Sequence, residues 1–275
     1  MLQNISALLK ACDALNINYE TQHDTRNLIS ITLNGQTVIF CNWSTPFNSH
    51  SVSQLCLDKD YFYHVYRSVI NFPKTHSFMS PYCSENYFPY LKAETVTDII
   101  QMVEKDFHYP LIVKKNRGSL GRQVFVADNK KQLEGAILSI FNKQSASSDY
   151  VCLIQEKIDI AKEYRVVYFR GELCFAYEKN IEDATFDDNL SPLHWEGATA
   201  VLTRDEEILS QIDAFCQPMF KKMMIPFCGL DVAQDKQGTW WLIEANSSPG
   251  FSHIISAGEE EAVVNLYKKM LLSLQ

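Results

Sequence analysis

Two carboxylates and one amide near the C-terminal end of the chain have the types and spacing expected of a metal site. Asp231 lies in an apolar run after Gly229, and Glu244 and Asn246 close a second apolar run that begins at Trp240. Such oxygen donors suit magnesium, which commonly takes one or two protein carboxylates and completes its shell with phosphate and water. An unpaired carboxylate at the end of so apolar a run would also carry a desolvation cost. The residues therefore predict a magnesium site.

The expected geometry rests on a hairpin formed by these two runs. A turn centred on residues 236–237 places Asp231 opposite Leu242. Residues two apart on a strand point to the same face, so Glu244 and Asn246 would share the face of Asp231. Diagonal neighbours start roughly 7–8 Å apart, within joint reach of one cation. A second interpretation stays open, in which Asp231 caps a turn and Glu244 lies in solvent.

A lysine followed by a glycine-containing loop indicates phosphate binding. The run Pro110–Lys115 is an apolar strand that delivers Lys114, a point charge suited to phosphate. Gly118 and Gly121 let backbone N–H groups approach a triphosphate, and Ser119 adds a hydroxyl donor. The spacing matches neither the Walker pattern nor the dinucleotide fingerprint. A basic hairpin tip in solvent is the alternative.

The next strand has features that suit an adenine. The run Cys152–Ile158 is apolar and turns polar at its end, where exposed backbone can supply one donor and one acceptor. Glu163 could accept from ribose hydroxyls, and Arg165, alternating with it, could face an anion. A core strand followed by surface charges is the alternative.

Helices and hairpins alternate irregularly along the chain. Apolar stripes predict helices, two of which open on capping boxes at Thr95–Asp98 and Thr203–Glu206. Hairpins are expected around Asn34–Gly35, Arg170–Gly171 and Asp235–Gly238. Recurrent hairpins mixed with helices predict an α+β fold rather than a single parallel sheet.

Composition excludes several classes of function. The chain has 275 residues, 46% hydrophobic and 21% charged, with a net charge of -8. An acidic chain without a long basic run is a poor nucleic-acid binder. No apolar run could span a bilayer, and residues 1–10 lack a secretory pattern. None of the 8 cysteines forms a Cys-x-x-Cys pair, which argues against zinc and indicates a cytoplasmic protein.

Six segments in order resemble the ATP-grasp superfamily. They read Pro-Leu-Ile-Val-Lys, Gly-Ser-Leu-Gly, Gln-Glu-Lys-Ile, Glu-Tyr-Arg-Val, Gly-Leu-Asp-Val and Glu-Ala-Asn-Ser-Ser-Pro-Gly. The chain looks most like the ribosomal-protein glutamate ligase and glutathione synthetase branch, with D-alanine–D-alanine ligases as more distant kin. The match covers roughly residues 58–258. It implies two α+β subdomains that clamp ATP, preceded by a shortened N-terminal segment.

The resemblance also implies a division of the chain and a role for each matching residue. The segments would be residues 1–57 (shortened N-terminal segment), 58–109 (linker or central subdomain), 110–160 (lid subdomain) and 161–275 (C-terminal subdomain with the metal site). ATP would contact Lys114, Gly118, Ser119, Gly121, Gln155, Glu156, Ile158 and Glu163. Magnesium, or manganese in its place, would be held by Asp231, Glu244 and Asn246. Arg165 and Lys179 would face the phosphates or the acyl group, with Asn189 beside the reacting groups.

The activity implied by the resemblance is ATP-dependent ligation of a carboxylate to an amine through an acyl phosphate, with release of ADP and phosphate. Both substrates would be small molecules or peptides, with no nucleic acid or membrane partner, and no oligomeric state is favoured. Two alternatives use the same scaffold: a small-molecule kinase and a non-catalytic ATP-binding module. The family often has a second lysine in the helix after Asp58–Lys59, for which Lys74 is a candidate. The insert Ser191–Glu196 is either part of a substrate pocket or a packed loop.

Overall fold

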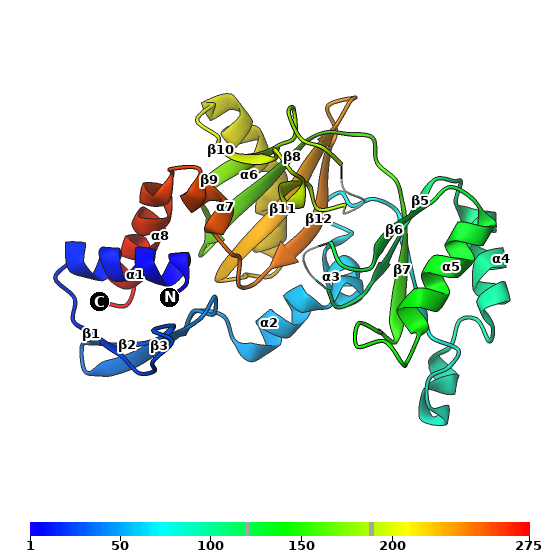
Figure 1. The fold of residues 1–275 in the computed structure, drawn as a ribbon, viewed down its shortest axis with the longest axis horizontal. Helices are drawn as coiled ribbons and strands as arrows, with labels where there is room; N and C mark the ends of the chain where they lie inside the picture. The colour runs from blue at the N-terminus through cyan, green and yellow to red at the C-terminus, as the bar shows by residue number, and fades with distance from the viewer. Residues whose placement is uncertain (119–120, 187–189) are drawn as a thin grey trace.

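The computed structural model describes residues 1–118, 121–186 and 190–275, and their strands form three antiparallel sheets (Figure 1). The first sheet has the order β1 (Tyr19–Thr21), β2 (Leu28–Leu33), β3 (Gln36–Cys41). The second, sheet B, has the order β4 (Thr75–Met79), β7 (Val151–Glu156), β5 (Leu111–Lys115), β6 (Val124–Ala127). The third, sheet C, has the order β10 (Thr199–Leu202), β9 (Glu172–Asn180), β8 (Ile160–Phe169), β11 (Phe227–Asp235), β12 (Trp240–Asn246).

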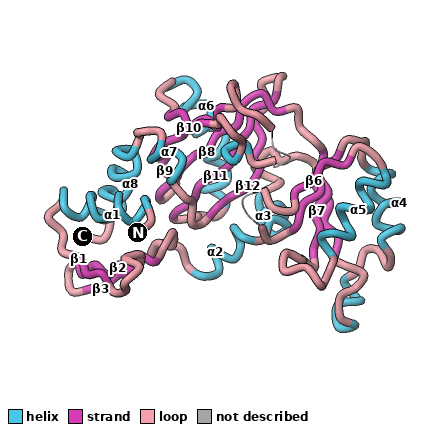
Figure 2. Tube along the Cα trace, viewed as in Figure 1, coloured by secondary structure: helices cyan, strands magenta, loops and turns pink. Residues whose placement is uncertain are grey.

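Helices cover the outer faces of these sheets (Figure 2). Sheet B carries α4 (Val96–Asp106) and α5 (Lys130–Phe141), and sheet C carries α6 (Glu206–Lys222). The others are α1 (Gln3–Ala14), α2 (His50–Leu57), α3 (Lys59–Tyr66), α7 (Ser252–Ser256), α8 (Glu260–Leu272) and the 3-10 turns η1 (Glu85–Tyr90) and η2 (Pro192–His194). Within the described residues, no helix is long and apolar enough to cross a bilayer. The α+β expectation is confirmed.

The two faces of sheet C differ in polarity and in what covers them, because successive side chains along each strand point to opposite faces. One face presents Tyr164, Val166 and Leu230 to α6, where all three are buried. The opposite face begins polar, with Glu163 and Arg165, and continues apolar through Val167 and Phe169 under α7 and α8. The polar half of that face is therefore available to a ligand, while the apolar half holds the sheet in place.

Sheet B is arranged in the same way. Leu111, Val113 and Ile154 are buried against α4 and α5. Their neighbours Lys114 and Gln155 point to the opposite face, toward sheet C. The period of two along β5 and β7 thus places a buried lysine and a buried amide on the ligand side.

The N-terminal segment is part of the core that lies under sheet C. Leu8 on α1 and Tyr267 on α8 are buried in one cluster that also contains Phe40 of β3. The segment 58–109 supplies β4, which pairs with β7 inside sheet B. The division of the chain at residues 57, 109 and 160 stays a prediction.

Two predicted hairpins and one capping box are confirmed. Asn34–Gly35 and Arg170–Gly171 each form a turn with positive φ at both residues, and Thr95 exchanges hydrogen bonds with Asp98. The expected box at Thr203–Glu206 is wrong. The helix begins at Glu206 because the carboxylate of Asp205 accepts from the N–H groups of Glu207 and Ile208.

Truncation of Leu8 tests whether the N-terminal segment belongs to the core. Leu8 is 0% exposed, so Leu8→Ala should lower the free energy of unfolding by about 2–5 kcal/mol through the cavity it leaves. The matched control is Leu138→Ala on α5, where the side chain is 42% exposed and the loss should be below about 1 kcal/mol. Urea unfolding measures both, and equal losses would mean that α1 is not an integral part of the fold.

Candidate nucleotide and metal site

A cleft of about 600 Å³ separates sheet B from the polar half of sheet C. Sheet B lines it with Ile112, Lys114 and Gln155, and sheet C with Arg165 and Asp231. The structure brings nearly all the predicted site residues to this cleft: Lys114, Gly118, Gly121, Gln155, Glu156, Ile158, Glu163, Arg165, Lys179, Asp231, Glu244 and Asn246. Their roles stay predictions. Ser119 and Asn189 lie outside the described residues.

The β11–β12 hairpin differs in register from the expectation. Asp235 accepts hydrogen bonds from the N–H groups of Gln237 and Thr239, and the turn is centred on Gln237, so Gln234 pairs with Trp240, one residue later than the expected Thr239. A bulge between Asp231 and Val232 then shifts the pairing again and sets Asp231 directly opposite Glu244. The expected pairing of Asp231 with Leu242 was wrong. The conclusion that the two carboxylates share a face holds, and they are closer than diagonal neighbours would be.

A network of buried charges crosses the middle of sheet C. Arg165 donates from Nε and Nη2 to the two oxygens of Asp231, with 3.1 Å between Nη2 and Oδ2. Lys179 lies 3.2 Å from the same Oδ2 and also donates to Glu163. The side chains of Asp231 and Lys179 are each 5% exposed. Two cations and two carboxylates thus neutralise one another where water is largely excluded.

The network shifts the pKa of each member in the direction that keeps its charge, except at Glu163. Burial alone would raise the pKa of Asp231, but Arg165 and Lys179 lower it below its usual value. Burial would lower the pKa of Lys179, which Asp231 and Glu163 instead raise. Burial raises the pKa of Glu163 against the opposing charge of Lys179. Glu163 is therefore the member that takes up a proton most readily.

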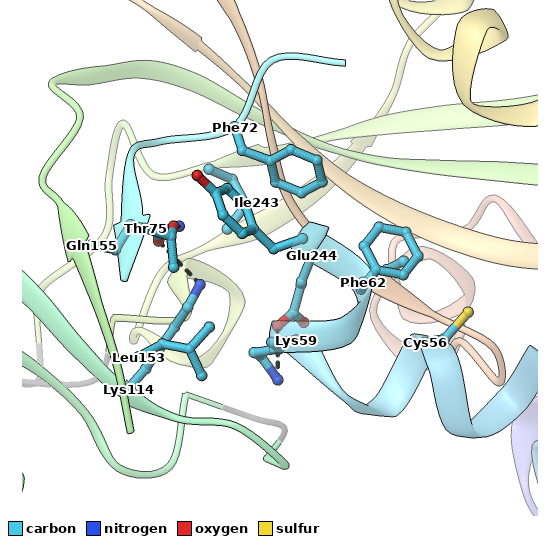
Figure 3. A pocket seen from close by; sticks show the side chains of 12 residues that line it. Cys56, Lys59, Phe62, Phe72, Thr75, Lys114, Leu153, Gln155, Ile243 and Glu244 are labelled. Atoms are coloured by element: carbon cyan, nitrogen blue, oxygen red, sulfur yellow. Dashed lines mark hydrogen bonds and ion pairs between the residues drawn. The ribbon is translucent and has the colours of Figure 1, made fainter. Parts of the chain in front are cut away.

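Glu244 and Asn246 lie at the edge of this network with oxygens directed to the cleft. Asn246 donates its amide to Glu244 Oε1 at 3.2 Å, and Lys59 Nζ lies 3.6 Å from Oε2. Figure 3 shows Lys59 and Glu244 pointing toward one another from α3 and β12. Among the described residues no three His, Cys, Asp or Glu side chains form a metal cage. Two carboxylates and an amide beside a cleft nevertheless fit magnesium, whose remaining ligands come from phosphate and water.

A chain of hydrogen bonds between strands of sheet B fixes the ammonium group of Lys114. Its Nζ donates to Gln155 Oε1 at 3.0 Å, and Gln155 donates to Thr75 Oγ1 at 2.8 Å (Figure 3). Burial lowers the pKa of Lys114 to about 8, helped by the charge of Lys59 and opposed by Glu244. The ammonium is thus fixed, poorly hydrated and short of a counter-charge, which suits an anionic ligand.

Lys74 is the candidate for the family's second lysine, but the structure brings Lys59, and not Lys74, to the cleft. Lys59 Nζ donates to the carbonyl oxygen of Gly118 at 2.7 Å and lines the cleft beside Lys114. Lys74 points away, donating to the carbonyl oxygen of Asp106 with its ammonium over the ring of Phe107. The sequence feature that could have pointed to Lys59 is Asp58, because its carboxylate caps α3 and so places Lys59 in the first turn of this helix.

The loop between β5 and β6 is tied at its β5 end to the first turn of α3 and to the residue that caps this helix. Asn116 Oδ1 accepts from the N–H of Asp60 at 2.9 Å, and Arg117 bonds the buried carboxylate of Asp58. Gly121 has φ 66°, a conformation that favours glycine. Arg122 lines the cleft and was missed as a candidate. The predicted phosphate loop is therefore positioned over the same space as Lys59 and Lys114.

Glu156 and Ile158 flank the point where the chain leaves sheet B. Glu156 Oε1 accepts from the N–H of Lys74, which fixes this side chain to the sheet edge. Lys157–Asp159 lie outside any strand, so their backbone groups can meet a flat polar ligand. Ile112, Val124 and Ile158 supply apolar surface around them. This end of the cleft has the features expected of an adenine pocket.

The opposite end of the cleft is lined by Trp43 and His253, which sequence reasoning did not single out, and by His194 of the insert 191–196. Trp43, from the loop after β3, packs beside Gly250, where a Cβ would lie 3.7 Å from Nε1. His194 of η2 and His253 of α7 have ring centroids 5.8 Å apart. Their sequence carries no recognisable motif, and only the packing of α7 and η2 against sheet C brings them together. The insert 191–196 thus contributes to the cleft.

Comparison with known proteins gives a family and a fold. The model of the RimK-like ATP-grasp domain matches residues 89–274, more than half of the chain. A probable alpha-L-glutamate ligase of Parasynechococcus marenigrum (strain WH8102) is 31% identical over 163 residues, covering 58% of this chain and 31% of that protein. The chain thus aligns with only about a third of the length of this relative.

Three solved structures share the fold at low sequence identity. The D-alanine–D-alanine ligase from Bacillus anthracis has a TM-score of 0.55 at 16% identity, over 82% of this chain and 71% of its own. Its complex with ATP has a TM-score of 0.52 at 16% identity, over 82% and 69%. The VanG D-Ala:D-Ser ligase from Enterococcus faecalis has a TM-score of 0.54 at 19% identity, over 80% and 64%.

The charge network predicts a contrast between two neighbouring carboxylates. Asp231→Asn leaves two buried cations short of a partner and should lower the free energy of unfolding by about 3–5 kcal/mol. Glu244→Gln keeps the volume and removes only a contact of 3.6 Å, so its loss should stay below about 1 kcal/mol. Urea unfolding without ligands measures both. A large loss for Glu244→Gln would show that this side chain holds the hairpin together.

Lys114 predicts a pH dependence of ATP binding. Because its pKa is lowered to about 8, raising the pH from about 7 to 9 removes the ammonium proton and should weaken ATP affinity up to roughly tenfold. Lys114→Arg stays charged and should abolish this slope, while Lys114→Met should bind at least about tenfold more weakly throughout. Calorimetric titration with magnesium-ATP measures it. An unchanged slope in both variants would assign the titration to another group.

Proposed function

The chain belongs to the RimK-like ATP-grasp family, and on this premise we propose that it is an ATP-dependent ligase that joins a carboxylate to an amine. The observation that carries the proposal is the cleft itself. One wall supplies the buried cation Lys114, and the other supplies Asp231 and Glu244 beside Arg165. A triphosphate and a metal ion need these charges on facing walls.

The nucleotide would lie with its base at the end of β7. The proposed contacts are the backbone of Glu156–Ile158 for adenine and Glu163 for the ribose. Glu163 is already bonded to Lys179, so a ribose hydroxyl would donate to its second oxygen. Lys59 and Lys114 then meet the phosphates, and the loop that includes Gly118, Ser119 and Gly121 covers them.

Asp231, Glu244 and Asn246 are proposed to hold magnesium. The ion, when bound, would neutralise charge on the β- and γ-phosphates and so favour phosphoryl transfer. Arg165 and Lys179 already balance the charge of Asp231, so Asp231 would supply a ligand at a fixed position more than a net negative charge. Glu244 is the ligand with the least compensated charge, because its nearest cation is 3.6 Å away.

The proposed reaction has two steps. A carboxylate oxygen of the substrate attacks the γ-phosphorus, and the bond to the ADP oxygen breaks. An amine then attacks the carbonyl carbon of the acyl phosphate, and inorganic phosphate leaves. Arg165 has five N–H donors and gives two to Asp231, so others can orient an anionic group of the substrate. Lys179 and Asn189 are proposed to act beside it.

An acyl phosphate hydrolyses unless water is kept out, which explains a loop over the phosphates. The contact from Lys59 to the carbonyl of Gly118 shows how the loop can be held over the cleft. Both substrates are proposed to be small molecules or peptides, with L-glutamate the first to test because of the name of the relative. Eight free cysteines, six of them buried, support a cytoplasmic location.

Product analysis tests the reaction type. Incubation with magnesium-ATP, L-glutamate, and other amino acids and short peptides should give ADP, phosphate and one equivalent of a new amide, identified by mass. Glu244→Gln should lower this rate by at least about a hundredfold, because the triphosphate loses a counter-charge. AMP and pyrophosphate as products would contradict the proposal. ADP with a stable phosphorylated alcohol would identify a kinase.

A further inference from the structure

The end of the cleft away from sheet B has a chemical character of its own. In Figure 1, α7 and β9 lie at the left end of sheet C, whereas β5, β6 and β7 lie to its right. The turn η2 contacts β9. Trp43, His194 and His253 line the cleft here, and all three side chains are exposed to it or to solvent. A ligand bound at Lys114 and β7 would leave this end open for a second substrate.

The carboxylates that line the described part of the cleft are all engaged. Glu156 accepts from the N–H of Lys74, Glu163 from Lys179, and Asp231 from Arg165 and Lys179. Glu244 accepts from Asn246 and lies near Lys59. Each of the four carboxylates therefore already has a partner, and none of them lies on η2 or α7 at this end of the cleft.

Three further titratable groups of the described lining either keep their proton or already have a partner. Burial raises the pKa of Tyr177, so its hydroxyl keeps its proton near neutral pH. The ammonium of Lys179 is held by two carboxylates, and that of Lys114 donates to Gln155 at the opposite wall. His194 and His253 contact each other edge to face, and an imidazole accepts protons near neutral pH.

We infer that this end of the cleft binds the acceptor amine and that His253 takes its proton during amide formation, with His194 and Trp43 positioning the amine. The inference rests on the proposed ligase function. The amine nitrogen forms a bond to the acyl carbon, the carbon–oxygen bond to phosphate breaks, and phosphate leaves with the electron pair. The N–H proton passes to the free ring nitrogen of His253 and from there to solvent.

The surroundings of His253 keep it in the form that accepts a proton. Partial burial lowers its pKa, and the neighbouring His194 on η2, Arg165 on β8 and Lys179 on β9 lower it further. His253 is thus neutral near pH 7. His253 also lines the same cleft as Arg165 and Lys179, the two cations proposed to act on the substrate.

Hydroxylamine separates the two steps experimentally. It is largely unprotonated near neutral pH and captures acyl phosphates without help from a base, so it reports acyl phosphate formation alone. An alkyl amine such as glycinamide is largely protonated and needs a base. His253→Asn should lower glycinamide-dependent amide formation from ATP and L-glutamate by about a hundredfold, while hydroxamate formation falls less than about threefold. Because the ring is exposed, the variant should melt like the wild type.

His23→Asn is the matched control, since His23 is exposed on the first sheet's side of the molecule and bonds only Thr25. Amide and hydroxamate rates should both be unchanged in it. An unchanged amide rate in His253→Asn would overturn the inference, and so would an equal loss of amide and hydroxamate. If the wild type forms no hydroxamate and releases no ADP with any carboxylate tested, the proposed ligase function fails, and the inference falls with it.

Discussion

The rest of the structure depends on the need to keep buried charges paired. Arg165, Lys179, Asp231 and Glu163 lie on three neighbouring strands of sheet C where little water reaches them. Removing Lys179 would leave Glu163 unpaired, and removing Asp231 would leave Arg165 unpaired, each at a cost of several kcal/mol. The strands must therefore keep their register, and the polar half of the sheet face must remain a wall of fixed charge. The apolar half of the same face, under α7 and α8, supplies the packing that enforces this register.

The same constraint explains why the two walls of the cleft differ. On sheet C each charge is compensated by another charge, whereas Lys114 on sheet B has only neutral partners, Gln155 and beyond it Thr75. The neutralised charges of sheet C can hold a ligand in a fixed position, whereas the uncompensated ammonium of Lys114 can attract an anionic ligand. Lys59 stands between the walls and touches both, through Glu244 and the carbonyl of Gly118.

Local patterns predicted much of this, because they depend on neighbours in sequence. The period of two placed Glu163 and Arg165 on one face, and Asn34–Gly35 and Arg170–Gly171 specified their turns. The register of the β11–β12 hairpin was missed, because the hydrogen bonds of Asp235 and the bulge at Asp231 are tertiary features without a pattern of their own. Trp43 and His253 were missed for a similar reason: the elements that carry them meet the insert with His194 only after sheet C is packed.

The bulge between Asp231 and Val232 divides the β11–β12 hairpin into two parts, and the strand pairing of each part is set by different contacts. From Val232 to Gln234, the pairing with β12 follows the loop closed by Asp235. On the other side of the bulge, Asp231 pairs with Arg165 of β8 and with Glu244 of β12. The position of the carboxylates is thus set from the neighbouring strand rather than from the loop. In evolutionary terms, residues 236 and 237 should tolerate substitution more readily than Gly238, whose φ of 83° favours glycine, and than the segment from Gly229 to Asp231, whose pairing positions the carboxylates.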